Sequence, residues 1–204
     1  QKLSKFKFLF FFQIGGYSTY DKNISPNKKA FVSLIKHIAD YSRVGLKTSF
    51  FAIDNAAILK KEKTIIEQII NKPLKASRQS FSKLNLPESY RNYIGLEIFE
   101  DYTMGYVDEI GFRAGTCSPF FFYDLDYEIQ TPLKVFPYQL LDAVLLKTKS
   151  LLDKKQVLNE IINEVKQVNG EFIAVFHNYT FGASQRWFGF KALFNIILES
   201  ANEN

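Results

Sequence analysis

The chain has 204 residues, of which 47% are hydrophobic and 23% are charged, and its net charge is +5 at pH 7. This composition excludes an intrinsically disordered chain and predicts one globular domain with a substantial core. The excess of positive charge is modest, and acidic residues interrupt the lysines, so no basic face for nucleic acid stands out. We therefore expect no nucleic-acid partner.

The N-terminal residues combine basic side chains with a short apolar run, as a signal peptide does. The run lacks a small-residue cleavage site and is too short to span a bilayer. We expect instead a buried strand at residues 7–14 that ends in a turn at Gly15-Gly16, and no transmembrane segment. Because the chain starts with Gln1 rather than Met, we expect it to be an N-terminally incomplete piece of a longer protein.

Beyond this strand, short apolar strands alternate with amphipathic helices. We predict, in chain order, a helix at 27–41 capped by Asn27, a strand at 44–46, a helix to residue 71 capped by Asp54 or Asn55, a strand at 74–77, a helix at 87–93, a strand at 96–100, an extended segment at 133–136, mainly helix at 140–152, a helix at 154–168 with Gly170 as its C-cap, a strand buried on both faces at 172–176 and a helix at 190–200. This alternation predicts an α/β fold with a mainly parallel sheet or barrel, in a single domain over residues 1–204.

Polar or small residues directly follow the predicted strands. In parallel α/β folds, binding sites gather at the carboxyl ends of the strands, so we expect these residues to converge on one cleft. Residues 100–130 are irregular and rich in acids and aromatics, which is typical of a functional loop. The end-of-strand candidates are Gly15-Gly16, Lys47-Thr48-Ser49, Arg78-Gln79-Ser80, Asp101, Arg113 and His177-Asn178.

Several of these positions belong to longer motifs. They include Ser77-Arg78-Gln79, Leu84-Asn85-Leu86-Pro87, Glu100-Asp101-Tyr102-Thr103-Met104-Gly105-Tyr106, Gly111-Phe112-Arg113-Ala114-Gly115-Thr116, Tyr123-Asp124-Leu125-Asp126 and Phe176-His177-Asn178. Together they resemble the NodB-like polysaccharide deacetylases, in their Bacteroidetes-type form, over nearly all of the chain. The resemblance implies a distorted (β/α) barrel of mainly parallel strands. It also implies a bacterial hydrolase of carbohydrate metabolism that removes acetyl groups from N-acetylated sugars with a divalent metal such as zinc.

The metal ligands of that family are an early aspartate and two histidines, and this chain departs from all three. Where relatives read Gly-Leu-His-Pro-Ser, the chain has Lys47 in place of the histidine, and where they read Arg-Gln-His-Tyr it has Ser80. A protonated lysine has no lone pair to offer a cation, and a serine hydroxyl is a poor substitute for imidazole. The early Asp-Asp motif is not found, and a segment preceding Gln1 is one place for it. We expect no metal cofactor in this chain.

The resemblance also assigns the remaining site residues. His177 matches the general-acid histidine, and Arg78 and Asp101 match motifs near the base, so these three are the catalytic candidates. The sequence leaves open that His177 is structural, that ion pairs organise the loop, and that Trp187 packs in the core. The candidates for contact with substrate are Arg113, Asp124, Asp126, Tyr106 and Trp187.

Two further reactive side chains are weaker candidates for a functional site. His37 falls inside an amphipathic helix and is expected to be structural. Cys117, the single cysteine, has no histidine partner in sequence and cannot form an internal disulfide. No cluster of His, Asp and Cys with metal-ligand spacing is present.

Two hypotheses for function follow. One is a polysaccharide deacetylase domain, and the other is a catalytically inactive relative that serves as a carbohydrate-binding or structural module. The 21 Phe and 11 Tyr side chains have two possible roles. They pack in the core, or some of them line a groove that stacks on sugar rings. The sequence leaves open which glycan is involved, the oligomeric state, and whether the protein is cytoplasmic or attached to a bacterial envelope.

Overall fold

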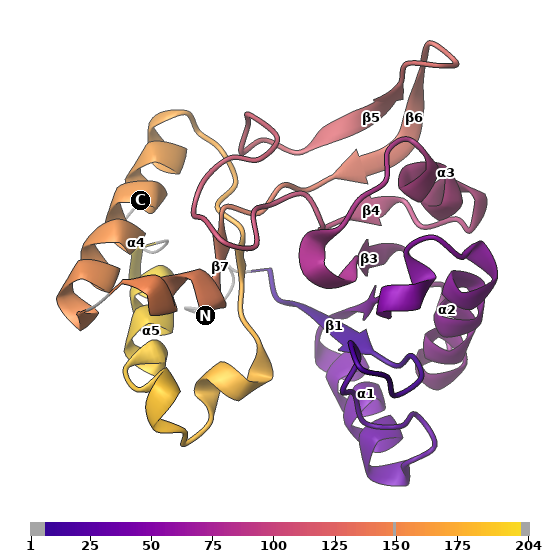
Figure 1. Ribbon diagram of the computed structural model, residues 1–204, viewed down its shortest axis with the longest axis horizontal. Coiled ribbons are helices and arrows are strands. Elements are labelled where there is room, and N and C mark those ends of the chain that lie inside the picture. The colour runs from indigo at the N-terminus through magenta and orange to yellow at the C-terminus, as the bar shows by residue number, and fades with distance from the viewer. Residues whose placement is uncertain (1–6, 149, 201–204) are drawn as a thin grey trace. The chain divides into compact units, whose positions relative to one another are not determined.

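The computed structural model describes residues 7–148 and 150–200, and these form an α/β fold (Figure 1). They divide into two compact units. The first, the sheet unit, comprises Phe8–Met104 and Pro119–Phe136. The second, the helical unit, comprises the described residues of Gly105–Ser118 and Pro137–Asn204, together with Lys7.

The sheet unit contains a six-stranded sheet in the order β1-β2-β3-β4-β6-β5. Every pair is parallel except β5 with β6, so the prediction of a mainly parallel α/β sheet is confirmed. Among the described residues the sheet is open rather than closed into a barrel. Its strands are β1 (Leu9–Gln13), β2 (Arg43–Lys47), β3 (Ala76–Arg78), β4 (Glu100–Asp101), β5 (Phe120–Asp124) and β6 (Ile129–Val135).

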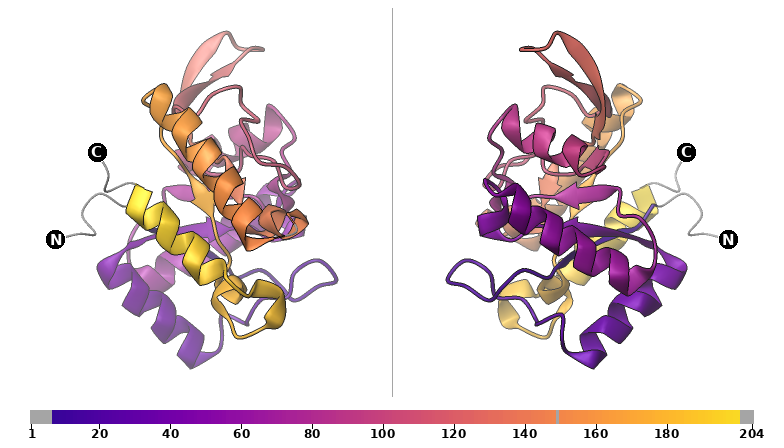
Figure 2. Two further views of the ribbon diagram at one scale, coloured as in Figure 1. Left: turned by 90° about the vertical axis from the view of Figure 1, so that its left-hand side faces the viewer. Right: turned by 90° about the vertical axis from the view of Figure 1, so that its right-hand side faces the viewer.

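Three helices of this unit pack on one face of the sheet. They are α1 (Lys29–Tyr41), α2 (Ala56–Ile70) and α3 (Glu88–Gly95), and the right-hand view of Figure 2 has them on the side toward the viewer. Their apolar stripes meet the strands in one core, which includes Ile35, Leu46, Ile66, Tyr93 and Leu133. The carboxyl ends of β1 to β4 are therefore followed by the connecting loops and are not covered by these helices.

The helical unit has a separate core. Helices α4 (Leu151–Gln167) and α5 (Phe190–Ser200) lie side by side in the left-hand view of Figure 2. Leu158 and Ile162 of α4 meet Phe190 and Leu193 of α5 in this core. The short strands β7 (Leu140–Leu141) and β8 (Ala174–Val175) pair in parallel beside them.

The helix ends correct two predicted caps. At α2 the side chain of Asn55 accepts hydrogen bonds from the backbone N–H groups of Ala57 and Ile58, as predicted. At α1, however, the N-cap is Lys28 and no side chain caps the helix, so the prediction for Asn27 is wrong. At the end of α4 the left-handed residue is Asn169, at φ 52°, and not Gly170. The N–H of Gly170 donates to the carbonyl of Val165, which is the pattern of a Schellman motif.

Three other segments differ from the sequence prediction. The expected strand at 96–100 shrinks to β4, because Leu96 still caps α3 through its N–H. The expected helix at 140–152 begins instead with β7 and the 3-10 helix Asp142–Lys147. The expected doubly buried strand at 172–176 is the two-residue β8, and it is only half-buried.

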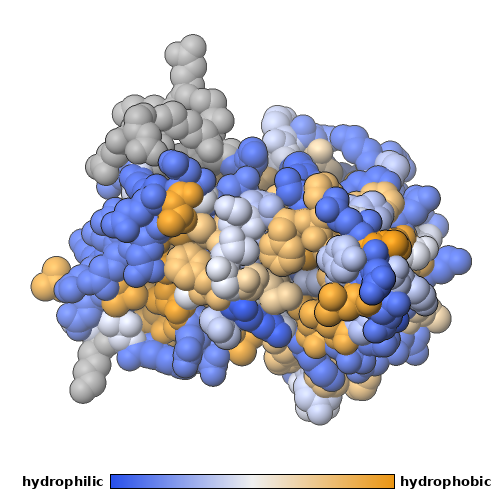
Figure 3. Space-filling view, turned by 90° about the horizontal axis from the view of Figure 1, so that it is seen from above, coloured by the Kyte–Doolittle hydropathy of each residue, from blue (hydrophilic) through white to orange (hydrophobic). Residues whose placement is uncertain are grey.

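The largest difference is the β5–β6 hairpin, which occupies part of the segment expected to be an irregular loop. Its first strand contains four consecutive aromatic residues, Phe120–Tyr123, and this β-favouring run was a usable strand signal. Figure 3, the view from above, shows hydrophobic residues exposed among hydrophilic ones. The exposed apolar side chains of the hairpin are Phe121, Tyr123, Leu125, Tyr127 and Ile129.

Candidate functional site

The predicted site residues divide between the two units. Lys47, Arg78, Ser80 and Asp101 lie in the sheet unit with Asp124 and Asp126, whereas His177, Arg113, Tyr106 and Trp187 lie in the helical unit. Their convergence on one cleft stays a prediction. Each half of the candidate site is therefore built from its own unit.

In the sheet unit, the last residues of three neighbouring strands form a row. Gln13 pairs with Lys47 in the β1–β2 register, and Lys47 pairs with Arg78 in the β2–β3 register. Paired residues of adjacent parallel strands point to the same face, about 4.8 Å apart along the sheet. Two cationic side chains, Lys47 and Arg78, thus stand next to each other at the carboxyl end of the sheet.

Ser80 lies just after this row and is buried. Its Oγ donates a hydrogen bond to the carbonyl oxygen of Thr48 at 2.5 Å. The amide Nε2 of Gln13 donates to the same Oγ at 3.5 Å. The hydroxyl of Ser80 therefore serves to hold the β2 and β3 loops together.

Two buried carboxyl groups that the sequence analysis did not single out contact the loops that follow β1 and β2. Asp21 accepts hydrogen bonds from the backbone N–H of Phe50 and from the side chains of Gln13 and Ser18. Glu62 on α2 is 3% exposed and accepts one from the N–H of Ser49 at 3.0 Å. Burial raises the pKa of Glu62, and the charge of Asp21 raises it further.

A glycine makes room for these carboxyl groups. A Cβ on Gly15 would lie 2.7 Å from Oε1 of Glu62 and 2.4 Å from the Cβ of Ser49. Oε1 itself has no hydrogen-bond partner among the described residues. The turn at Gly15 after β1 was expected from the sequence, but the polar cluster beneath it was hidden, because Glu62 falls on the apolar stripe of a helix.

Asp101, at the end of β4, is 0% exposed. Its Oδ2 accepts a hydrogen bond from the hydroxyl of Tyr90 at 2.9 Å, and its Oδ1 accepts one from Thr103. Burial raises the pKa of Asp101 to about 6, although these hydrogen bonds and the charge of Arg78 oppose the rise. The catalytic assignment of Asp101 stays a prediction, and in this structure the carboxyl group joins α3 to the sheet.

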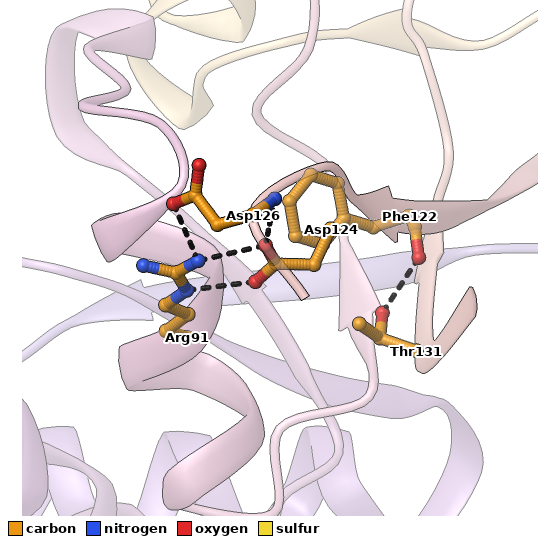
Figure 4. A network of polar contacts seen from close by, with 5 residues as sticks. All are labelled: Arg91, Phe122, Asp124, Asp126 and Thr131. Atoms are coloured by element: carbon orange, nitrogen blue, oxygen red, sulfur yellow. Dashed lines mark hydrogen bonds and ion pairs between the residues drawn. The ribbon is translucent and has the colours of Figure 1, made fainter. Parts of the chain in front are cut away.

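Asp124 and Asp126 form ion pairs with Arg91 of α3 rather than with Arg113 (Figure 4). The Arg91 guanidinium donates two hydrogen bonds of 2.7 Å to Asp124 and one of 2.7 Å to Asp126. These bonds hold the pKa of Asp124 below its usual range. The network fastens the β5–β6 hairpin to α3, which favours the structural interpretation that the sequence left open.

In the helical unit, His177 follows β8 and is held by Asp142. Its Nδ1 lies 2.9 Å from Oδ1 of Asp142, and its backbone N–H donates to Oδ2 at 2.6 Å. A carboxylate can only accept, so Nδ1 carries the proton and Nε2 is the basic nitrogen. Tyr179 stacks on the imidazole with the ring centroids 4.8 Å apart. Sequence reasoning missed Asp142, because residues 140–152 were predicted to be mainly helix, whereas in the structure Asp142 directly follows the strand β7.

The other candidates of this unit have mainly structural contacts. Arg113 donates to the carbonyl of Gly105 at 3.3 Å, and the carbonyl of Tyr106 accepts from the hydroxyl of Tyr138 at 3.0 Å. Trp187 packs on the core around α5, with its ring centroid 5.3 Å from that of Tyr179. The ring of Tyr179 therefore contacts both Trp187 and His177.

The remaining reactive side chains have local contacts of their own. His37 is on α1 in ring contact with Tyr41. Cys117 is a buried free thiol that touches the position of Gly170. No helix within residues 7–148 and 150–200 is long and apolar enough to cross a membrane.

The residues at the expected metal positions do not fit a divalent cation. Lys47 offers no lone pair while charged, and it stands beside a second cation, Arg78. Ser80 has its proton directed at a carbonyl and is held in place by it. Among the described residues, no three His, Cys, Asp or Glu side chains are grouped so that they could hold a metal ion.

The described fold is that of an α/β protein with a mainly parallel, open sheet. Among solved structures, the chain is similar to that of a "putative polysaccharide deacetylase" from Mycobacterium smegmatis, with a TM-score of 0.58 and 12% sequence identity. The match covers 82% of this chain and 60% of that one, so the chain spans only part of its neighbour's length. No family model and no curated protein matches the sequence. At this identity the likeness is one of fold.

Proposed function

We propose that this chain is a polysaccharide deacetylase-like domain that binds an N-acetylated glycan without metal-dependent hydrolysis. The fold shared with the Mycobacterium smegmatis protein and the sequence motifs support the carbohydrate assignment. The main support for a loss of hydrolysis is the row of Gln13, Lys47 and Arg78 at the carboxyl ends of β1, β2 and β3. On the resemblance, Lys47 stands at a position where the family has a neutral imidazole ligand, and a second cation, Arg78, stands beside it.

A second candidate function is retained hydrolysis of N-acetyl groups, and the pairing of His177 with Asp142 favours it. A carboxylate that fixes the imidazole tautomer leaves Nε2 able to accept a proton and, once protonated, to give it to a leaving amine. On this alternative the catalytic residue is His177, and Asp142 is its positioning residue.

One experiment separates the two candidates. A pentamer of N-acetylglucosamine is titrated into the protein by calorimetry, and acetate release is followed in the same samples. Binding without acetate supports the proposal. Acetate release that His177→Ala abolishes supports retained hydrolysis. Neither binding nor release of acetate, with this pentamer or with N-acetylated peptidoglycan fragments, would overturn the carbohydrate assignment.

The metal part of the proposal has its own test. We expect calorimetry of the wild type against zinc to show no tight stoichiometric binding, since Lys47 and Ser80 replace two imidazoles. Lys47→His combined with Ser80→His should raise zinc affinity if the two positions match the family's ligands. A stoichiometric zinc ion in the wild type would contradict the proposal.

A further inference from the structure

Four aromatic side chains gather where the chain leaves three neighbouring strands. Tyr20 lies in the loop after β1, Phe50 and Phe51 in the 3-10 helix Phe50–Ala52 after β2, and Phe81 in the 3-10 helix Ser80–Ser82 after β3. We call these four residues the aromatic patch. Consecutive loops at the carboxyl ends of parallel strands are where α/β proteins place their ligands.

The rings of the aromatic patch contact one another around Phe50. Tyr20 stacks on Phe50 with centroids 4.1 Å apart and an angle of 22° between the rings. Phe51 and Phe81 meet Phe50 edge to face, at 5.5 Å and 5.6 Å. The patch is therefore a built surface of mutually supporting rings and not a chance scatter of apolar residues.

Three of the rings nevertheless remain open to solvent. Tyr20 is 51% exposed, and Phe51 and Phe81 are each 54% exposed. Exposed apolar surface with a polar rim marks a binding site. The rim here carries the ion pair of Lys83 with Asp54, and the ammonium of Lys83 also lies over the ring of Phe50.

The backbone at Phe81 adds an independent observation. Phe81 has φ 58° and ψ 14°, in the left-handed region that a bulky residue rarely adopts, and Ser82 follows with φ 48°. Hydrogen bonds on both sides hold this conformation: Ser80 Oγ donates to Thr48, and the N–H of Ser82 donates to the carbonyl of Gln79. A strained residue kept in place by its surroundings indicates a functional position.

Burial of the side chain does not offset this strain, because Phe81 stays more than half exposed. Glycine would adopt the same backbone at no cost. Within the protein the phenyl ring meets Phe50 and Tyr20 edge to face, and more than half of the residue remains exposed and able to contact a ligand. A protein interface buries about 800 Å² on each partner, far more than a few rings present.

We propose that the aromatic patch is a sugar-stacking subsite that binds one pyranose ring of the glycan. A pyranose has a face of C–H groups and an edge of hydroxyls. The C–H face covers the exposed rings of Phe51 and Phe81, and the hydroxyl edge meets Lys83 and Asp54 on the rim. This inference rests on the proposed function, and it adds the residues that hold the sugar.

The test uses the full chain and the same N-acetylglucosamine pentamer. Phe81→Gly removes the ring and relieves the backbone, so it should leave the midpoint of thermal unfolding unchanged or higher while affinity falls about tenfold or more. Phe51→Ala should weaken binding similarly. Tyr41→Ala is the matched control, because Tyr41 is 80% exposed on α1 and outside the aromatic patch.

The outcomes separate this inference from the proposed function. If the wild type binds the pentamer and both patch variants bind equally well, the subsite is wrong and the proposed function stands. If the wild type binds no N-acetylated glycan, the proposed function fails and the subsite fails with it. A concentration-dependent dimer that Phe81→Gly dissolves would also overturn the subsite, since a second copy would then cover the rings.

Discussion

Asp142 holds His177 through both its ring and its backbone: one carboxylate oxygen faces Nδ1 at 2.9 Å and the other accepts the backbone N–H at 2.6 Å. Asp142 is fully buried, so these contacts are made away from water. The histidine is thereby fixed in position, in tautomer and in the path of its backbone.

Replacing Asp142 by Asn should disturb that organisation. An amide has a single acceptor oxygen, so its NH₂ group would face either the imidazole N–H or the backbone N–H of His177. We expect a loss of about 1–3 kcal/mol in the free energy of unfolding. We also expect a shift of the imidazole from the Nδ1–H tautomer toward Nε2–H, read by nitrogen NMR. An unchanged tautomer would mean that Asp142 is only a backbone acceptor.

The buried carboxyl of Asp101 predicts a pH dependence of stability. Its pKa rises to about 6 in the fold, from an ordinary value of 3.8, so the folded state binds the proton more tightly than the unfolded state. The stabilisation is complete below about pH 4 and is lost as the pH rises through 6, and it amounts to about 3 kcal/mol. Glu62 adds a contribution of the same sign, because its pKa is also raised.

Urea unfolding between pH 4 and pH 7 measures this effect. Asp101→Asn carries no titrating group at that position, so the stability advantage of the wild type over the variant should shrink as the pH rises. A difference that stays constant over this range would show that Asp101 titrates near its ordinary pKa in the fold.

The α/β class could be predicted because the hydrophobic residues of long amphipathic helices repeat with a recognisable helical period, and the apolar runs of the longer strands are also recognisable in the sequence. Helix α5 falls on the predicted residues, and α2 begins after the predicted Asn55. The predicted bounds of the short strands β4 and β8 were wrong. Two residues are too few to show a hydrophobic period, and the length of such a strand depends on the neighbouring strand with which it pairs.

The candidate site was predictable only where the chemistry follows a strand. His177 and the Lys47–Arg78 row could be found in this way. Glu62 could not, because a carboxyl on a helix stripe reads as a surface charge until the fold closes over it. The partner of Asp124 could not be found either, since Arg91 lies 33 residues away on another element.

The caps offer a matched pair of substitutions. Asn55→Ala removes the acceptor for two backbone N–H groups at the start of α2, and we expect a loss of about 0.5–2 kcal/mol in the free energy of unfolding. Asn27→Ala should have little effect, because Asn27 is exposed and does not cap α1. Equal losses in the two variants would contradict the assignment of the caps.

Gly170 should tolerate no side chain. A Cβ there would lie 2.1 Å from the Sγ of Cys117, inside the core of the helical unit. We expect Gly170→Ala to cost about 1–3 kcal/mol. Gly95→Ala, at the end of α3 where a Cβ meets nothing within 4 Å, should instead stabilise the protein by up to about 1 kcal/mol. Chemical denaturation of both variants checks the contrast in sign.

Arg91→Lys should loosen the β5–β6 hairpin while leaving the rest of the sheet unit intact. The guanidinium reaches two carboxylates at once and lies 4.4 Å from the ring centroid of Tyr127, and an ammonium group cannot reproduce this planar geometry. We expect faster hydrogen exchange of the amides in β5 and β6, with exchange in β1 and β2 unchanged. Arg43→Lys is the control, because its ion pair with Glu100 lies outside the hairpin. Slow exchange in the hairpin of Arg91→Lys would mean that strand pairing alone holds it, and that Asp124 and Asp126 are free for the substrate role that the sequence suggested.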